Sequence, residues 1–150
     1  APSLNEIKRI KRILKNVSLI KLAKEEAQWF FNTSNPLEIS LSLPHRPSVI
    51  VTDGSNPISW LLNNHLGKSF AISSLPVVDT TGAGDAFTAG LIYKLLSVEL
   101  DQISKEIAEE IIHFAIACGA HVCKGIGAID PQPYIEDIEK LLSLSNGGVS

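Results

Sequence analysis

The chain has 150 residues, of which 45% are apolar and 19% are charged. This length suits one compact domain, and the composition is that of an ordinary globular protein rather than a disordered one. Thirteen Lys and Arg residues against sixteen Asp and Glu give a formal charge of −3. We therefore predict no nucleic-acid partner, which would require a basic surface. No apolar run approaches the roughly 20 residues of a membrane span, so we predict no membrane partner either.

The two cysteines, Cys118 and Cys123, lie in an apolar segment and cannot form a disulfide framework. Free thiols in a reducing cytoplasm are the simplest interpretation. The N-terminus also has no basic-then-apolar signal pattern. His113 and His121 lie nearby, but the spacing of these four residues fits no zinc site. We therefore predict a cytoplasmic protein without a structural metal.

The first part of the chain predicts two helices and a short strand. Residues 3–16 carry apolar side chains at helical spacing, and Ser3 with Glu6 forms a capping box that starts the helix. The run 17–22 has strand length, and a second helix over 24–31 ends before the breaker at 32–36. We expect the basic residues of the first helix to form a solvated face; these are Lys8, Arg9, Lys11, Arg12 and Lys15. We expect Trp29, Phe30 and Phe31 to lie in the core.

The middle of the chain predicts strands and the end predicts helices. Residues 48–52 are nearly all β-branched or apolar, as a strand buried on both faces would be, and they stop at the Asp53-Gly54 turn. Two further strands are predicted over 58–62 and 69–75, across a polar turn at 63–68. Val77 and Val78 lead into a glycine cluster, and three helices follow over 85–97, 103–121 and 134–144. Strands mixed with helices predict an α/β layered sheet.

The segment Asp79-Thr-Thr-Gly-Ala-Gly-Asp-Ala-Phe87 carries the strongest chemical signal. Two glycines around an alanine let the backbone turn tightly and aim successive N–H groups at one spot. The helix that follows adds the positive end of its dipole. This arrangement suits a phosphate, or the charge that develops during phosphoryl transfer.

Asp85 stands at the start of that helix, where a carboxylate would repel a bound anion. It makes more chemical sense as a base that accepts a proton from an attacking hydroxyl. The alternative is an acidic first-turn residue that the helix dipole favours. Local sequence leaves both interpretations open.

Two common phosphate motifs are excluded by spacing. A dinucleotide fingerprint would need a small residue three positions after Gly84, where Phe87 stands. Gly67-Lys68-Ser69 ends like a P-loop, but Leu62 occupies the position of the first glycine. We interpret Gly67-Lys68-Ser69 as part of a hairpin turn.

The segment 79–87 resembles the C-terminal signature of the ribokinase (pfkB) family of carbohydrate kinases, in the version typical of fructokinases. Residues 49–55 are similar to the family's strand and loop at the nucleotide. Residues 114–120, with Gly127-Ala128-Ile129 and Pro133, resemble the helix and loop that cover adenine and potassium. Residues 20–27 resemble the segment with an Asn-x-x-Glu motif near magnesium. The resemblance spans nearly all of the chain.

The resemblance implies the C-terminal part of a ribokinase-like three-layer α/β/α sandwich. Residues 1–150 would be the nucleotide-binding and phosphoryl-transfer part of a single kinase domain, without the N-terminal sugar-binding half and the lid. The implied activity is ATP-dependent phosphorylation of a sugar hydroxyl by a carbohydrate kinase, most like a fructokinase. We expect the fragment alone to be inactive. The lid would form a homodimer contact.

The resemblance also implies residue roles, with ATP, Mg²⁺ and a monovalent cation such as K⁺ as ligands. Asp85 would be the general base, and the N–H groups of Gly82, Ala83 and Gly84 the anion hole. Glu26 would organise the magnesium indirectly, through water. Nucleotide contacts would come from Thr52, Gly54, Ser55 and Ile116, and the monovalent cation would be held by Asp79, Thr81, Val122, Gly125 and Gly127.

Three residues depart from the family pattern and motivate an alternative. Ala23 replaces the asparagine of Asn-x-x-Glu, Ile116 replaces a polar adenine contact, and Pro57 stands where a loop glycine is common. The alternative is a catalytically inactive, fructokinase-like binding or assembly protein. Another active possibility is a kinase for ribose, a nucleoside or 2-keto-3-deoxygluconate, because all of these acceptors would use the same C-terminal core.

Overall fold

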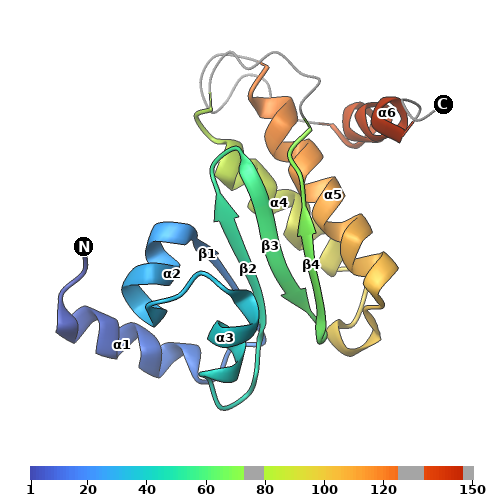
Figure 1. The fold of residues 1–150 in the computed structure, drawn as a ribbon. Coiled ribbons are helices and arrows are strands. Elements are labelled where there is room, and N and C mark those ends of the chain that lie inside the picture. Colours follow the sequence, from blue (N-terminus) through green and yellow to red (C-terminus); the bar gives the residue numbers. More distant parts are fainter. Residues whose placement is uncertain (73–79, 125–133, 147–150) are drawn as a thin grey trace. The chain divides into compact units, whose positions relative to one another are not determined.

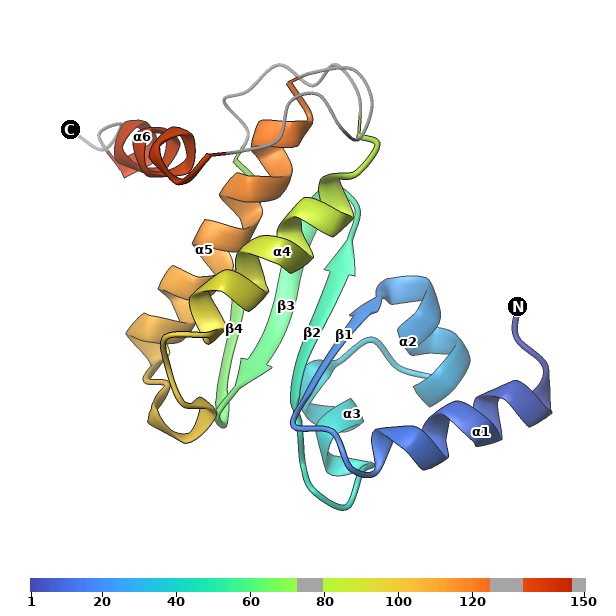
Figure 2. The same ribbon diagram turned by 180° about the vertical axis from the view of Figure 1, so that it is seen from behind.

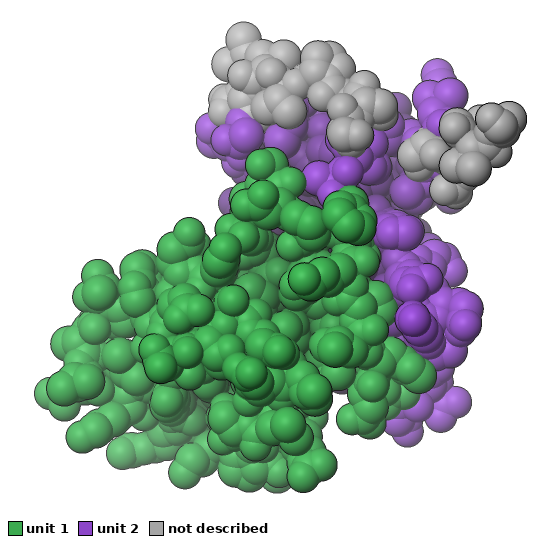
Figure 3. Space-filling model, viewed as in Figure 1, with its two compact units in different colours: residues 1–70 green, residues 71–150 purple. Residues whose placement is uncertain are grey.

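The structure, a computed structural model, describes residues 1–72, 80–124 and 134–146. The chain forms two compact units, residues 1–70 and residues 71–150, which Figure 3 shows in green and purple. The predicted mixture of strands and helices is confirmed. The first unit contains α1 (Leu4–Leu14), β1 (Leu19–Ala23), α2 (Lys24–Phe31), α3 (Pro36–Leu41), β2 (Ser48–Asp53), β3 (Asn56–Leu62) and β4 (His65–Ser69).

The first unit is built on a four-stranded sheet of order β1-β2-β3-β4. Strand β1 pairs in parallel with β2, and the pairs β2–β3 and β3–β4 are antiparallel (Figures 1 and 2). Helices α2 and α3 connect the two parallel strands and pack against them. Their shared core consists of Ile20, Leu22, Ala27, Ile39, Leu43, Val49 and Val51. The almost complete burial of Ser48 to Val51 agrees with the prediction of a strand covered on both faces.

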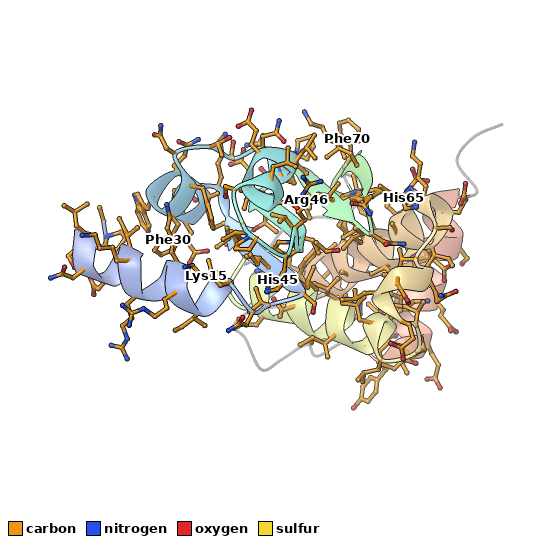
Figure 4. The ribbon with its side chains drawn as sticks, turned by 90° about the horizontal axis from the view of Figure 1, so that it is seen from below. Lys15, Phe30, His45, Arg46, His65 and Phe70 are labelled. Carbon is orange, nitrogen blue, oxygen red and sulfur yellow. The ribbon has the colours of Figure 1, made fainter. Side chains whose placement is uncertain are left out.

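Helix α1 begins at the predicted capping box. The Glu6 carboxylate accepts the Ser3 N–H at 2.7 Å, and the Ser3 hydroxyl accepts the Glu6 N–H at 3.3 Å. The hydrogen bond from the Ser3 backbone lowers the pKa of Glu6. The apolar side of α1 is only partly covered, because Leu14 packs against the core while Leu4 is exposed. Phe30, labelled in Figure 4, also packs against this core.

The hairpin between β3 and β4 corrects two sequence predictions. The turn contains only Asn63 and Asn64, with φ of 44° and 64°, as a tight hairpin turn requires. The strand predicted over 69–75 instead lies at 65–69, and residues 73–75 lie outside the described residues. Gly67-Lys68-Ser69 is therefore in a strand rather than in a turn. Asn63 and Asn64 do form the turn, whereas His65 and Lys68 belong to the strand, at a half-buried and an exposed position respectively.

Two further differences from prediction lie earlier in the chain. The first strand begins at Leu19 instead of at residue 17. Helix α3 was not predicted and begins within the predicted breaker; the Asn35 side chain accepts the Leu37 N–H at 2.9 Å, and Pro36 occupies the first turn. Asn-Pro thus starts a helix here, because proline fixes a helical φ and needs no N–H partner at that position.

The second unit is helical in its described residues. Its elements are α4 (Ala83–Leu95), a 3₁₀ turn η1 (Leu100–Gln102), α5 (Lys105–Val122) and α6 (Ile135–Asn146). All three predicted helices are confirmed within two residues. The segment around Val77 and Val78 lies outside the described residues. None of the described helices is both long enough and apolar enough to cross a membrane.

Helices α4 and α5 approach closely at Gly90. A Cβ atom at Gly90 would lie 2.7 Å from the Sγ of Cys118, so only glycine allows this approach. Burial raises the pKa of the Cys118 thiol to about 11. Neither cysteine forms a disulfide, as predicted. The low thiolate fraction makes Cys118 a packing group rather than a nucleophile.

Candidate phosphoryl-transfer site

The start of α4 is a tight turn that ends in a helix. Gly82 has φ 80° and ψ −4°, the conformation that the third residue of a type II turn adopts and that favours glycine. The Ala83 N–H closes this turn on the Thr80 carbonyl at 3.2 Å, and the Ala86 N–H begins the helix on the Gly82 carbonyl at 2.9 Å. The sequence therefore places the N-terminus of α4 directly after the turn.

This helix N-terminus presents N–H groups to an exposed surface. The Ala83 N–H already has an acceptor, whereas the N–H groups of Gly84 and Asp85 lie in the first turn, where a helix supplies no carbonyl partner. The N-cap residue, Gly82, has no side chain with which to cap the helix. A Cβ atom at Gly84 would meet nothing within 4 Å. Neither packing nor backbone conformation requires glycine at that position. The absence of a side chain at Gly84 leaves room for a ligand.

Asp85 lies at the same N-terminus with an exposed side chain. Within the described parts of the chain, its carboxylate takes part in no hydrogen bond or ion pair. The nearby Thr88 hydroxyl is engaged instead by the Gly84 carbonyl, at 2.9 Å. Asp85 can therefore accept a proton from a bound hydroxyl without breaking an existing contact.

The last turns of α5 lie against this helix start. A Cβ atom at Gly119 would lie 3.0 Å from the Ala83 carbonyl oxygen and 3.7 Å from the Cβ of Phe87. Val122, one turn further on, is the last residue of α5, where a helix leaves carbonyl oxygens without partners and carries the negative end of its dipole. Such oxygens, together with the exposed Thr81, fit the donor chemistry of a monovalent cation. The predicted cation ligands Asp79, Gly125 and Gly127 lie outside the described residues.

Replacing Gly119 with alanine is expected to disturb the helix start of α4. The added methyl group must displace the Ala83 carbonyl, which belongs to the backbone of the turn. We expect a lower unfolding midpoint, because overpacking of about 1–3 kcal/mol outweighs about 1 kcal/mol of gained helix propensity. We also expect weaker binding of pyrophosphate, measured by calorimetry.

Gly90→Ala is the matched control for Gly119→Ala. It overpacks the same pair of helices, but against the Cys118 side chain rather than against the first turn of α4. It should lower the unfolding midpoint without changing the affinity for pyrophosphate. An equal loss of affinity in both variants would contradict the coupling between Gly119 and the helix start.

The predicted nucleotide residues of the first unit lie together at one turn. Thr52 is near the end of β2, and Gly54 and Ser55 form the exposed connection to β3. Gly54 has φ 55°, which favours glycine. The Thr52 hydroxyl donates to the Leu22 carbonyl of the neighbouring strand at 3.4 Å. Ile116 belongs to α5 in the second unit and is only 6% exposed, so its first role is packing.

Glu26 lies in the first turn of α2, at the carboxyl end of β1. One of its carboxylate oxygens accepts the Ala23 N–H at 2.8 Å, and the side chain is otherwise exposed. A carboxylate in this state retains lone pairs for water around a magnesium ion. Ala23 itself offers no ligand. The donor set of this position therefore fits magnesium through water only.

One contact at this edge was not predicted from the sequence. The Lys24 ammonium donates to the Asp53 carboxylate at 2.8 Å and so joins α2 to the end of β2. This ion pair forms because the parallel alignment of β1 and β2 brings the carboxyl ends of both strands to one edge of the sheet. In the described residues, no group of three His, Cys, Asp or Glu side chains could hold a metal by itself.

A family comparison accounts for most of the chain. The sequence model of the pfkB family carbohydrate kinase matches residues 1–135. The chain belongs to the pfkB family of carbohydrate kinases. Among curated pfkB relatives, the probable fructokinase-7 of Arabidopsis thaliana is 31% identical over 142 residues, which cover 91% of this chain and 41% of that protein. The chain thus spans less than half the length of such relatives.

Solved structures agree with this family and confirm a ribokinase-like α/β fold over part of their length. The fructokinase from Vibrio cholerae O395 in its fructose, ADP and calcium-bound form has a TM-score of 0.74 at 25% identity, covering 91% of this chain and 44% of that one. A double mutant of the same fructokinase, bound to fructose, ADP and potassium, matches with a TM-score of 0.74 at 26% identity, over the same 91% and 44%.

Proposed function

We propose that this chain is the C-terminal, phosphoryl-transfer part of an ATP-dependent sugar kinase with a fructokinase-like acceptor. The observation that carries this proposal is the start of α4. A glycine without packing contacts, first-turn N–H groups and a carboxylate with no partner among the described residues occur there within three residues. An anion-binding helix start alone would only hold phosphate. The adjacent Asp85 adds the base that a transfer to a hydroxyl group requires.

The proposed reaction is a direct transfer at the γ-phosphorus of ATP. Asp85 takes the proton from a sugar hydroxyl as that oxygen attacks the γ-phosphorus and the bond to the β-phosphate oxygen breaks, which releases ADP and a sugar phosphate. Gly82, Ala83 and Gly84 form the anion hole for the charge on the transferred group. Because the Ala83 N–H is bonded to Thr80, the Gly84 N–H would contribute most.

The remaining roles concern nucleotide and cations. We assign Thr52, Gly54, Ser55 and Ile116 to the nucleotide. Glu26 would hold water molecules around Mg²⁺, which neutralises phosphate charge when bound. A monovalent cation would be held by Asp79, Thr81, Val122, Gly125 and Gly127. Through Val122 and the Gly119–Ala83 contact, α5 would then support the position of the helix start of α4.

The test is a sugar panel with the full-length polypeptide that carries residues 1–150. ADP formation from Mg-ATP should depend on the sugar and be greatest with fructose. Turnover with ribose, a nucleoside or 2-keto-3-deoxygluconate instead would retain the kinase and reject the fructokinase-like acceptor. Nucleotide binding without turnover on any sugar would favour the inactive binding or assembly protein, which Ala23 and Pro57 motivate. If neither binding nor turnover occurs, the proposal fails.

A further inference from the structure

The Lys24–Asp53 ion pair joins two elements at the carboxyl edge of the sheet. Lys24 is the first residue of α2 and Asp53 is the last residue of β2. The parallel register pairs Ala23 with Thr52, so the following residue of each segment lies at the same edge. The Lys24 side chain is 49% exposed and that of Asp53 only 27%. The Asp53 carboxylate is thus the more buried of the two charged groups.

Asp53 also reaches into the turn that carries the proposed nucleotide residues. The hydrogen bond from Lys24 lowers the pKa of Asp53. Asp53 also lies opposite Asn56, at the far side of the turn, in the β2–β3 register. The turn has little other support. Gly54 and Ser55 are exposed, a Cβ atom at Gly54 would meet nothing within 4 Å, and the register shifts between Val51 and Asp53.

We propose that the Lys24–Asp53 pair is a positioning device that holds the Asp53–Asn56 turn in the conformation that binds the nucleotide. The inference rests on the proposed function, because it assigns that turn to ADP and ATP. Lys24 is a positioning residue here, since it acts through Asp53. The pair anchors the turn to α2, the helix whose first turn also contains Glu26.

A purely electrostatic role for the two charges gives the opposite expectation for one variant. The phosphates of a nucleotide are attracted by an ammonium and repelled by a carboxylate. If only local potential mattered, Lys24→Met would weaken ADP binding and Asp53→Asn would strengthen it. If the pair positions the turn, both variants weaken binding. Asparagine keeps the size of aspartate and one accepting oxygen, so Asp53→Asn removes the charge of the ion pair without removing the side chain.

The experiment measures the affinity for ADP of the full-length polypeptide that carries residues 1–150, by calorimetry. We expect Lys24→Met and Asp53→Asn each to weaken ADP by about two- to fivefold, the range of a single exposed ion pair. The charge-reversed double variant, Lys24→Asp with Asp53→Lys, should regain most of the affinity. Amide exchange at Gly54 and Ser55, followed by NMR without nucleotide, should accelerate in both single variants and slow again in the double variant.

The matched control is a second ion pair, Lys94–Glu110, at 2.9 Å between α4 and α5. Lys94→Met and Glu110→Gln should leave ADP affinity unchanged. Stronger binding in Asp53→Asn, unchanged affinity in both single variants, or no recovery in the double variant would overturn the positioning role while ADP still binds to the wild type. A wild type that binds no ADP would instead overturn the proposed nucleotide site and this inference with it.

Discussion

Asp85→Asn is expected to lower sugar-dependent ADP formation by about 10²- to 10⁴-fold, because asparagine cannot accept the proton of the attacking hydroxyl. The exposed carboxylate has no partner in the described residues, so the substitution breaks no contact there that the fold depends on. The affinity for ADP should fall little, or rise, since one negative charge near the phosphates is lost. The measurement is steady-state turnover of the full-length polypeptide, together with ADP calorimetry.

Glu136→Gln is the control that separates catalysis from the helix dipole. Glu136 is likewise an exposed acidic residue in the first turn of a helix, α6. If Asp85 served only to favour the positive end of its helix, both variants would cause the same small loss of stability and neither would change turnover. Turnover of Asp85→Asn within tenfold of the wild type would rule out Asp85 as the base.

Gly67→Ala is expected to destabilise the first unit by about 3 kcal/mol, at the upper end of the usual overpacking range. Gly67 lies directly opposite Trp60 in the β3–β4 pair. A Cβ atom there would lie 2.2 Å from Cζ2 of the indole. The ring cannot move away easily, because Trp60 is 0% exposed and its N–H donates to the Ser69 hydroxyl at 3.0 Å. Urea unfolding, followed by tryptophan fluorescence, measures the change.

Two further variants identify the cause of that loss. Lys68→Ala, at the exposed neighbouring position, should leave the unfolding free energy almost unchanged. Trp60→Phe shortens the ring, so Gly67→Ala should cost less in the Trp60→Phe background than in the wild type; because Trp60→Phe removes a fluorophore, circular dichroism follows unfolding there. A double-mutant cycle measures this coupling. Strictly additive effects would show that the Trp60–Gly67 contact does not limit stability.

Elements were predicted correctly where every local signal in the sequence indicated the same structure. Lys24–Phe31 was predicted with the observed ends, because acidic residues begin it and a breaker ends it. The strand Ser48–Asp53 was recognised, over residues 48–52, from continuous β-branched character. The prediction failed where one sequence motif is compatible with two structures. Asn35-Pro36 marks both a loop and a helix start, and the polar residues and glycine at 65–69 suit both a turn and a strand at the end of a sheet.

The candidate site likewise contains features that the sequence identifies and contacts that it does not. The turn at Gly82, the helix start and Asp85 lie within one short segment, so the sequence alone could identify them. The Lys24–Asp53 pair joins residues 29 positions apart, and only the register of β1 against β2 brings them together. The close approach of Gly119 to the Ala83 carbonyl also depends on the packing of two helices. Contacts of this kind leave no pattern in a single sequence.

The order of the strands has a consequence for how the sheet is assembled during synthesis. Strands β2, β3 and β4 follow one another with short turns at Gly54-Ser55 and Asn63-Asn64, so their pairing closes only small loops. Strand β1 is synthesised before these three, yet in the described chain its one partner is β2, which follows only after residues 24–47. We therefore expect β2, β3 and β4 to pair on their own, with β1 joining a sheet that these later strands have already begun.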